Sequence, residues 1–138
     1  MIATRRRVRP VLFLLAGLAL VALSRLPQLL SPWLGLDGDE AVVALMAQHI
    51  RDGKELPLFF WGQNYGLTLP EAATIAAFFA IFGPSVIALK IAILVIWTGG
   101  CAALVQSVRV LGGHRAGLIA AALIIFCPAW FAWSLKAR

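Results

Sequence analysis

Four apolar segments divide the chain, at residues 11–30, 69–82, 86–108 and 116–135. Hydrophobic residues make up 62% of the chain and charged residues only 13%, whereas a soluble domain is about half apolar and a quarter charged. So few polar residues cannot cover the surface of a soluble domain of this size. The predicted fold class is therefore all-α: a polytopic transmembrane helical bundle with three or four spans.

The lengths of the segments indicate which of them can cross a membrane. Crossing the ~30 Å hydrocarbon core takes about 20 residues of helix. The last two segments are long enough, and the turn-like residues 109–115 join them. The second segment, 69–82, is shorter and ends at Gly83-Pro84. It is predicted to be either a short span or a helix that lies in the interface.

Charge is sorted along the chain, and this sorting predicts its orientation. Four arginines precede the first apolar segment, and all six acidic residues fall between positions 37 and 71. Because basic flanks stay on the cytoplasmic side, residues 1–10 are expected to be a cytoplasmic tail, 11–30 the first span and 31–68 an extracytoplasmic loop. The expected location is the cytoplasmic (inner) membrane. The net charge of +6 is therefore attributed to the topology of the chain in the membrane, and no nucleic-acid partner is predicted.

The first segment also fits a secretory signal peptide, with a basic start, a short apolar core and a cleavage-like Ala22-Leu23-Ser24. The apolar segments that follow it favour an uncleaved signal-anchor instead.

Three carboxylates stand together in the sequence Leu36-Asp37-Gly38-Asp39-Glu40-Ala41. A helical pattern follows to Arg51, and Gly53 suits its left-handed stop. The simplest interpretation makes Asp37 the N-cap and Glu40 its capping-box partner. A calcium loop is excluded because Ala41 occupies the place of the third ligand. The apolar stripe that predicts an amphipathic surface helix consists of Val42, Leu45, Met46 and His49.

Aromatic and amide residues are interleaved between positions 57 and 71. They suit an anchor at headgroup depth, and they equally suit a pocket for a sugar or a lipid phosphate. Thr68 and Glu71 have the spacing of a second capping box, with Pro70 in the first turn.

The order of several motifs resembles the N-terminal part of the polytopic GT-C glycosyltransferases, in particular the protein-mannosyltransferase-like and aminoarabinose-transferase-like group. The resemblance covers about residues 10–135. It implies transfer of a sugar from a polyprenyl-phosphate-linked donor to an acceptor hydroxyl on the extracytoplasmic side. The motifs that carry it are Asp39-Glu40-Ala41, Phe60-Trp61-Gly62-Gln63-Asn64-Tyr65-Gly66, Leu69-Pro70-Glu71, Phe82-Gly83-Pro84 and Ala88-Leu89-Lys90-Ile91.

The resemblance also implies roles for individual residues. Asp39 takes the place of the catalytic base, and Glu40 orients the acceptor or holds Asp39. The family's Lys or His before the proline of the second segment is replaced here by Leu67-Thr68-Leu69. No cofactor and no metal are assigned. The candidate substrate-binding residues are Gln63, Asn64, Tyr65 and Glu71.

Relatives in this family are several times longer, so the chain is expected to be an N-terminal fragment that is inactive alone. Its expected partners are the donor, membrane lipids and the remaining transmembrane segments of the full-length chain. Two other classes of function stay open. One is a small non-catalytic membrane partner or assembly subunit, in which the acids only cap helices. The other is a transporter, which the clustering of the acids in a loop disfavours, since only Lys90 is expected at membrane depth.

Overall fold

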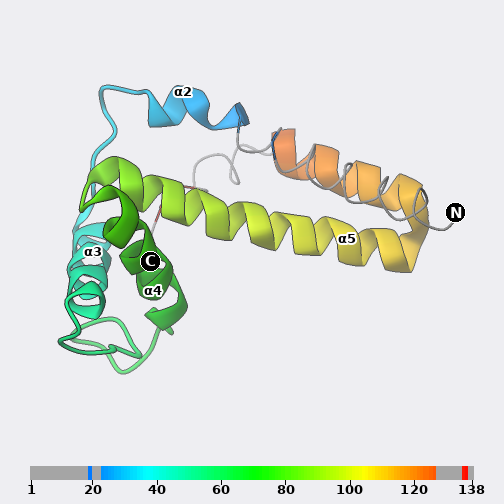
Figure 1. The fold of residues 1–138 in the computed structure, drawn as a ribbon. Helices are drawn as coiled ribbons and strands as arrows, with labels where there is room; N and C mark the ends of the chain where they lie inside the picture. The colour runs from blue at the N-terminus through cyan, green and yellow to red at the C-terminus, as the bar shows by residue number, and fades with distance from the viewer. Residues whose placement is uncertain (1–18, 20–22, 127–134, 137–138) are drawn as a thin grey trace, which may run out of the picture. The chain divides into compact units, whose positions relative to one another are not determined.

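The computed structural model describes residues 19, 23–126 and 135–136. Within them the regular secondary structure is helical, as predicted, and one isolated antiparallel bridge joins Phe59 and Leu67 in a loop. Most of the predicted first span, and the end of the last one, lie outside the described residues. The four helices of the described part are α2 (Leu26–Leu29), α3 (Gly38–Arg51), α4 (Leu69–Phe82) and α5 (Val86–Phe126) (Figure 1).

The chain forms two compact units. The first, here called the hairpin unit, comprises Met1–Pro27 and Trp97–Phe131. The second, here called the α3–α4 unit, comprises Gln28–Ile96 and Ala132–Arg138. The α3–α4 unit contains every candidate site residue.

Helix α5 is long and apolar enough to cross a membrane. Its 41 residues would measure about 60 Å if straight, twice the ~30 Å hydrocarbon core. Gly113 interrupts it with a non-helical backbone (φ 84°, ψ 177°), and the chain folds back there (Figure 1). A Cβ on Gly117 would lie 2.8 Å from the Cβ of Arg109, so the two arms touch at this glycine. The non-helical backbone is thus confined to Gly113, whereas the sequence predicted a link over residues 109–115.

Helix α3 packs against α4, and its buried face shares only part of the predicted stripe. Leu45, a member of that stripe, is 49% exposed, whereas Val43 and Ala47 are fully buried. The predicted stripe is thus confirmed at Met46, which is fully buried, and wrong at Leu45. The buried side chains are of mixed size: Val43, Ala44, Met46 and Ala47 in α3, and Ala72, Ile75, Ala76 and Phe79 in α4.

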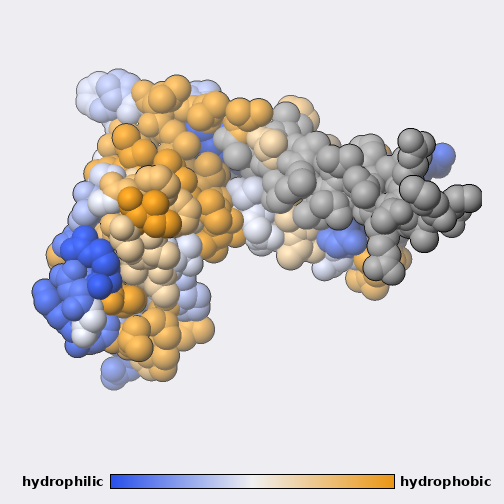
Figure 2. Space-filling view, in the orientation of Figure 1, coloured by the Kyte–Doolittle hydropathy of each residue, from blue (hydrophilic) through white to orange (hydrophobic). Residues whose placement is uncertain are grey.

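Helix α4 begins and ends at the residues predicted for the second apolar segment. It ends at Gly83, whose positive φ of 78° suits glycine. At 14 residues it would measure about 21 Å, which is too short for a perpendicular span. Figure 2 shows an apolar surface over α4, while hydrophilic side chains gather at the end of α3.

The predicted second capping box, between Thr68 and Glu71, is wrong. Thr68 has a helical backbone (φ −95°, ψ −15°) and its side chain makes no capping hydrogen bond. Its hydroxyl instead donates to the carbonyl oxygen of Gly66, at 3.0 Å. The hydroxyl that the spacing assigned to the cap is therefore bonded to a carbonyl two residues before it in the chain.

Candidate functional site

The N-terminus of α3 is closed by the capping box that the sequence predicts. The Asp37 Oδ1 atom accepts from the Glu40 backbone N–H, and Glu40 Oε2 accepts from the Asp37 backbone N–H, both at 3.0 Å. The Glu40 N–H, and then the Lys136 ammonium, hold the pKa of Asp37 below its usual value. Two of the three clustered carboxylates therefore have a structural role.

Glu40 has a second partner, which sequence reasoning missed. Its Oε1 atom accepts from Lys90 Nζ in the second turn of α5, at 2.5 Å. Glu40 is 1% exposed and Lys90 4% exposed. A lone lysine in an apolar segment was the available signal, because a charge at such a place requires a partner.

A second lysine, Lys136, pairs with Asp37 on the solvent-exposed side of these residues. Lys136 Nζ lies 3.1 Å from Asp37 Oδ2, and both side chains are about 40% exposed. We call Asp37, Glu40, Lys90 and Lys136 the charge network. It links two acids and two bases, so its formal charges cancel.

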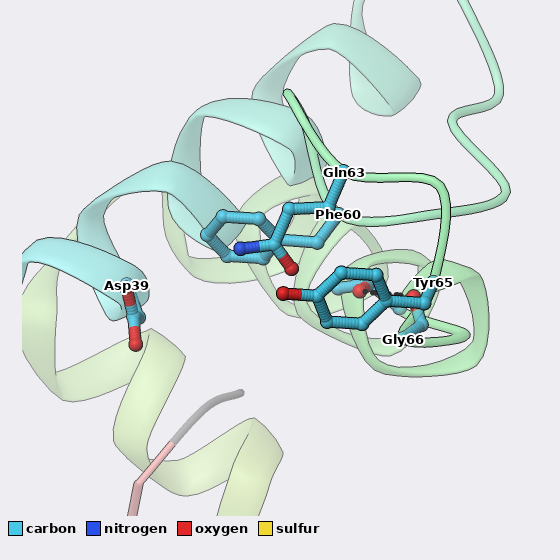
Figure 3. Close-up of a pocket in the computed structure, with 6 residues that line it drawn as sticks. Asp39, Phe60, Gln63, Tyr65 and Gly66 are labelled. Atoms are coloured by element: carbon cyan, nitrogen blue, oxygen red, sulfur yellow. Dashed lines mark hydrogen bonds between the residues drawn. The ribbon is translucent and has the colours of Figure 1, made fainter.

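Asp39 lies between the two acids of the network in sequence but points elsewhere. Successive residues of a helix are rotated by about 100° around its axis, so a neighbour of the buried Glu40 can face solvent. Asp39 is exposed and lines a pocket of about 140 Å³. In Figure 3 the Tyr65 hydroxyl and the Gln63 amide point toward the side on which Asp39 lies. The other lining residues are Phe60, Gly66 and Thr68.

The loop that forms the far side of the pocket is folded by its own backbone. The Phe60 N–H donates to the Gly66 carbonyl at 3.2 Å, beside the Phe59–Leu67 bridge. The Gln63 N–H donates to the Phe60 carbonyl at 3.0 Å, and Gly62 has a φ of 80°. This is the pattern of a type II turn, which needs glycine at its third residue.

An aromatic contact joins the same loop to α3. The ring of Trp61 meets the ring of His49 edge-on, with their centroids 4.8 Å apart. His49 also lies 3.5 Å from a carboxylate oxygen of Glu55. His49 is thus a packing residue of the helix face, as its sequence pattern predicts.

The predicted site residues separate into two groups. Asp39, Gln63 and Tyr65 line one pocket. Asn64 is exposed beside it, and Glu71 is half-buried in the first turn of α4, but neither is among the lining residues. Phe60, Gly66 and Thr68 were missed as lining residues, because the sequence does not show which loop side chains face α3. Within the described residues, no three His, Cys, Asp or Glu side chains gather as a metal site requires.

No protein-family model matches the chain, and neither does any curated protein or solved structure. Its function therefore has to be argued from Asp39, the pocket and the charge network.

Proposed function

We propose that this chain belongs to a membrane glycosyltransferase of the GT-C type, which transfers a sugar from a polyprenyl-phosphate-linked donor to an acceptor hydroxyl on the extracytoplasmic side. One observation carries the proposal. Of the three clustered carboxylates, Asp37 and Glu40 are bound within the charge network, whereas Asp39 lines a pocket together with Gln63 and Tyr65.

The chemistry of this transfer suits such an arrangement. The acceptor oxygen attacks the anomeric carbon, the bond from that carbon to the lipid phosphate breaks, and the hydroxyl proton must leave. A carboxylate within hydrogen-bond reach of the hydroxyl can take that proton. Asp39 is proposed as this base, and Glu40 as the residue that holds the helix turn around it. Gln63 and Tyr65 offer hydrogen bonds to sugar hydroxyls, and Phe60 offers an apolar ring face.

The size of the pocket limits what it would hold. Its volume of about 140 Å³ is below the roughly 300–1,000 Å³ of pockets that enclose whole ligands. It would therefore take the reacting end of the substrates, with the polyprenyl chain outside in the lipid. The exposed apolar side chains Ile81, Phe82 and Ile87 suit such a lipid environment. Asn64 and Glu71 are proposed to contact parts of the substrates that extend beyond the pocket.

A non-catalytic membrane partner is the second candidate. The capping box and the ion pairs explain Asp37 and Glu40 without any chemistry. The two candidates therefore differ in what they require of Asp39, which only the transferase needs as a carboxylate.

The test is Asp39→Asn in the natural full-length protein, assayed in membranes for transfer of a labelled sugar from a polyprenyl-phosphate donor. Asparagine keeps the size of the side chain but cannot act as a general base. We expect the rate to fall by about 10²–10⁴-fold, with normal amounts of protein in the membrane.

Asp37→Asn is the matched control, because asparagine caps a helix as well as aspartate does. It should retain most of the activity. Equal rates in the Asp39→Asn variant and the parent would refute the catalytic role. A collapse of both variants, with little protein in the membrane, would assign the whole cluster to structure.

A further inference from the structure

The ion pair between Glu40 and Lys90 is the most deeply buried polar contact of the α3–α4 unit for which both partners are charged. Glu40 is 1% exposed and Lys90 4% exposed, and they come from positions 50 residues apart. Burying a carboxylate without an ion-pair or hydrogen-bond partner is strongly unfavourable, because the carboxylate loses its hydration and no protein group replaces it. Lys90 is therefore a close ion-pair partner of a buried carboxylate.

Glu40 in turn holds the turn on which Asp39 stands. While Oε1 binds Lys90, Oε2 accepts the Asp37 backbone N–H, and the Glu40 N–H donates back to Asp37. The backbone on both sides of Asp39 is thereby tied. The position of Asp39 at the pocket depends on this turn, which depends on Glu40 being anchored.

We propose that Lys90 is a positioning residue: by pairing with the buried Glu40 carboxylate it fixes the first turn of α3 and so the position of Asp39 at the pocket. The catalytic consequence of this role rests on the proposed function, whereas its structural part does not. Lys136 is the contrasting case, because its partner Asp37 is half-exposed and stays solvated when the pair is lost.

Three variants of the full-length protein test the role of Lys90. Lys90→Met removes the ammonium and keeps an apolar chain of similar length, so the buried Glu40 carboxylate loses this ion pair. The double variant Glu40→Gln with Lys90→Met removes both charges and keeps a capping-box residue, since glutamine serves at this position. Lys136→Met is the control at the exposed end of the charge network.

The structural readout is the distance between spin labels on Gly38→Cys and Leu67→Cys, in a background without Cys101 and Cys127. Position 38 is exposed and open to a side chain, and Leu67 is 65% exposed beside the pocket. We expect a narrow distance distribution in the parent, in Lys136→Met and in the double variant. Lys90→Met should give a broad distribution.

The catalytic readout is sugar transfer without the labels. Lys90→Met should lower kcat by about 10²-fold with KM nearly unchanged, which is the scale of a small misplacement of a reacting group. The double variant should recover most of this loss. Accumulation of the double variant in the membrane where Lys90→Met is degraded would support the same conclusion.

Two results would overturn the proposal. One is a Lys90→Met distribution as narrow as that of the parent. The other is a double variant whose distance distribution is as broad as that of Lys90→Met, or which fails to accumulate in the membrane. The effect of Lys90→Met would then not come from the loss of the ion pair with Glu40. If Asp39→Asn keeps full activity, the proposed function fails, but the distance measurement still decides the role of Lys90.

Discussion

The two ends of α3 carry similar charges in very different surroundings. At its N-terminus, Glu40 is buried against Lys90. At its C-terminus, Arg51 and Lys54 pair with Asp52 at 2.7 and 3.4 Å, and all three side chains are open to solvent. Both ends are capped, one by a capping box and the other by a glycine stop at Gly53. The difference between them therefore lies in burial.

Burial decides what each cluster contributes. Water screens an exposed pair and leaves its net stabilisation small. A buried pair has already lost its water, so the removal of one partner leaves a charge with no compensation. The N-terminal end of α3 is consequently the fixed end, and it is the end that carries Asp39.

The largest loss of stability is expected for Glu40→Ala. This substitution leaves Lys90 buried without the Glu40 carboxylate and also removes half of the capping box. The free energy of unfolding should fall by about 3–5 kcal/mol, the usual cost of breaking a buried pair. Circular dichroism during thermal unfolding in detergent micelles would measure it. Glu55→Ala, at the exposed end, is the control and should change little. A loss at Glu40 as small as the control's would contradict the role of burial.

An intermediate and pH-dependent effect is expected for Asp37→Asn. Its pKa is lower in the folded protein than the ordinary 3.8, because of hydrogen bonds from the Glu40 N–H and then from Lys136. The carboxylate therefore stabilises the fold above its unfolded pKa, and this contribution is lost as the pH falls through its folded pKa. The contribution of this carboxylate to stability is modest because the Asp37 side chain is 39% exposed.

The corresponding measurement follows the unfolding midpoint of both proteins from about pH 7 to about pH 2. Asp37→Asn should be slightly less stable than the parent at neutral pH, and the two curves should converge in acid. A difference that stays constant across this range would show that the carboxylate charge contributes nothing.

The smallest change in stability is expected for Asp52→Asn, at the C-terminal end of α3. Hydrogen bonding from Arg51, and then from Lys54, lowers the pKa of Asp52, but its side chain is solvated. Its unfolding midpoint at physiological salt should match that of the parent. A clear loss of stability that added salt abolishes would show that the exposed cluster matters after all.

Local features of the fold could be predicted from sequence because they depend on neighbouring residues. The Asp37–Glu40 capping box and the glycine stop at Gly53 need only a few consecutive residues, and both are present. The bounds of α4 follow from an apolar run that ends at Gly83. Asp39 and the loop residues Gln63 and Tyr65 could be selected by residue type, but not shown to share a pocket.

The same reasoning from residue spacing failed at two positions. Thr68 had the spacing of a cap, yet its hydroxyl bonds to the loop at Gly66. Leu45 had the spacing of a buried residue, yet it is 49% exposed, whereas its neighbour Met46 is fully buried.

Read without its fold, the sequence determines that the chain is helical, where α3 and α4 end, and that three acids open α3, because backbone hydrogen bonds and apolar runs are local. The tertiary structure alone decides which acid faces the pocket. The partners of Asp37 and Glu40 are lysines 99 and 50 residues away in the chain. The burial of a charge is set by whatever distant segments pack around it, and no short pattern in the sequence records that.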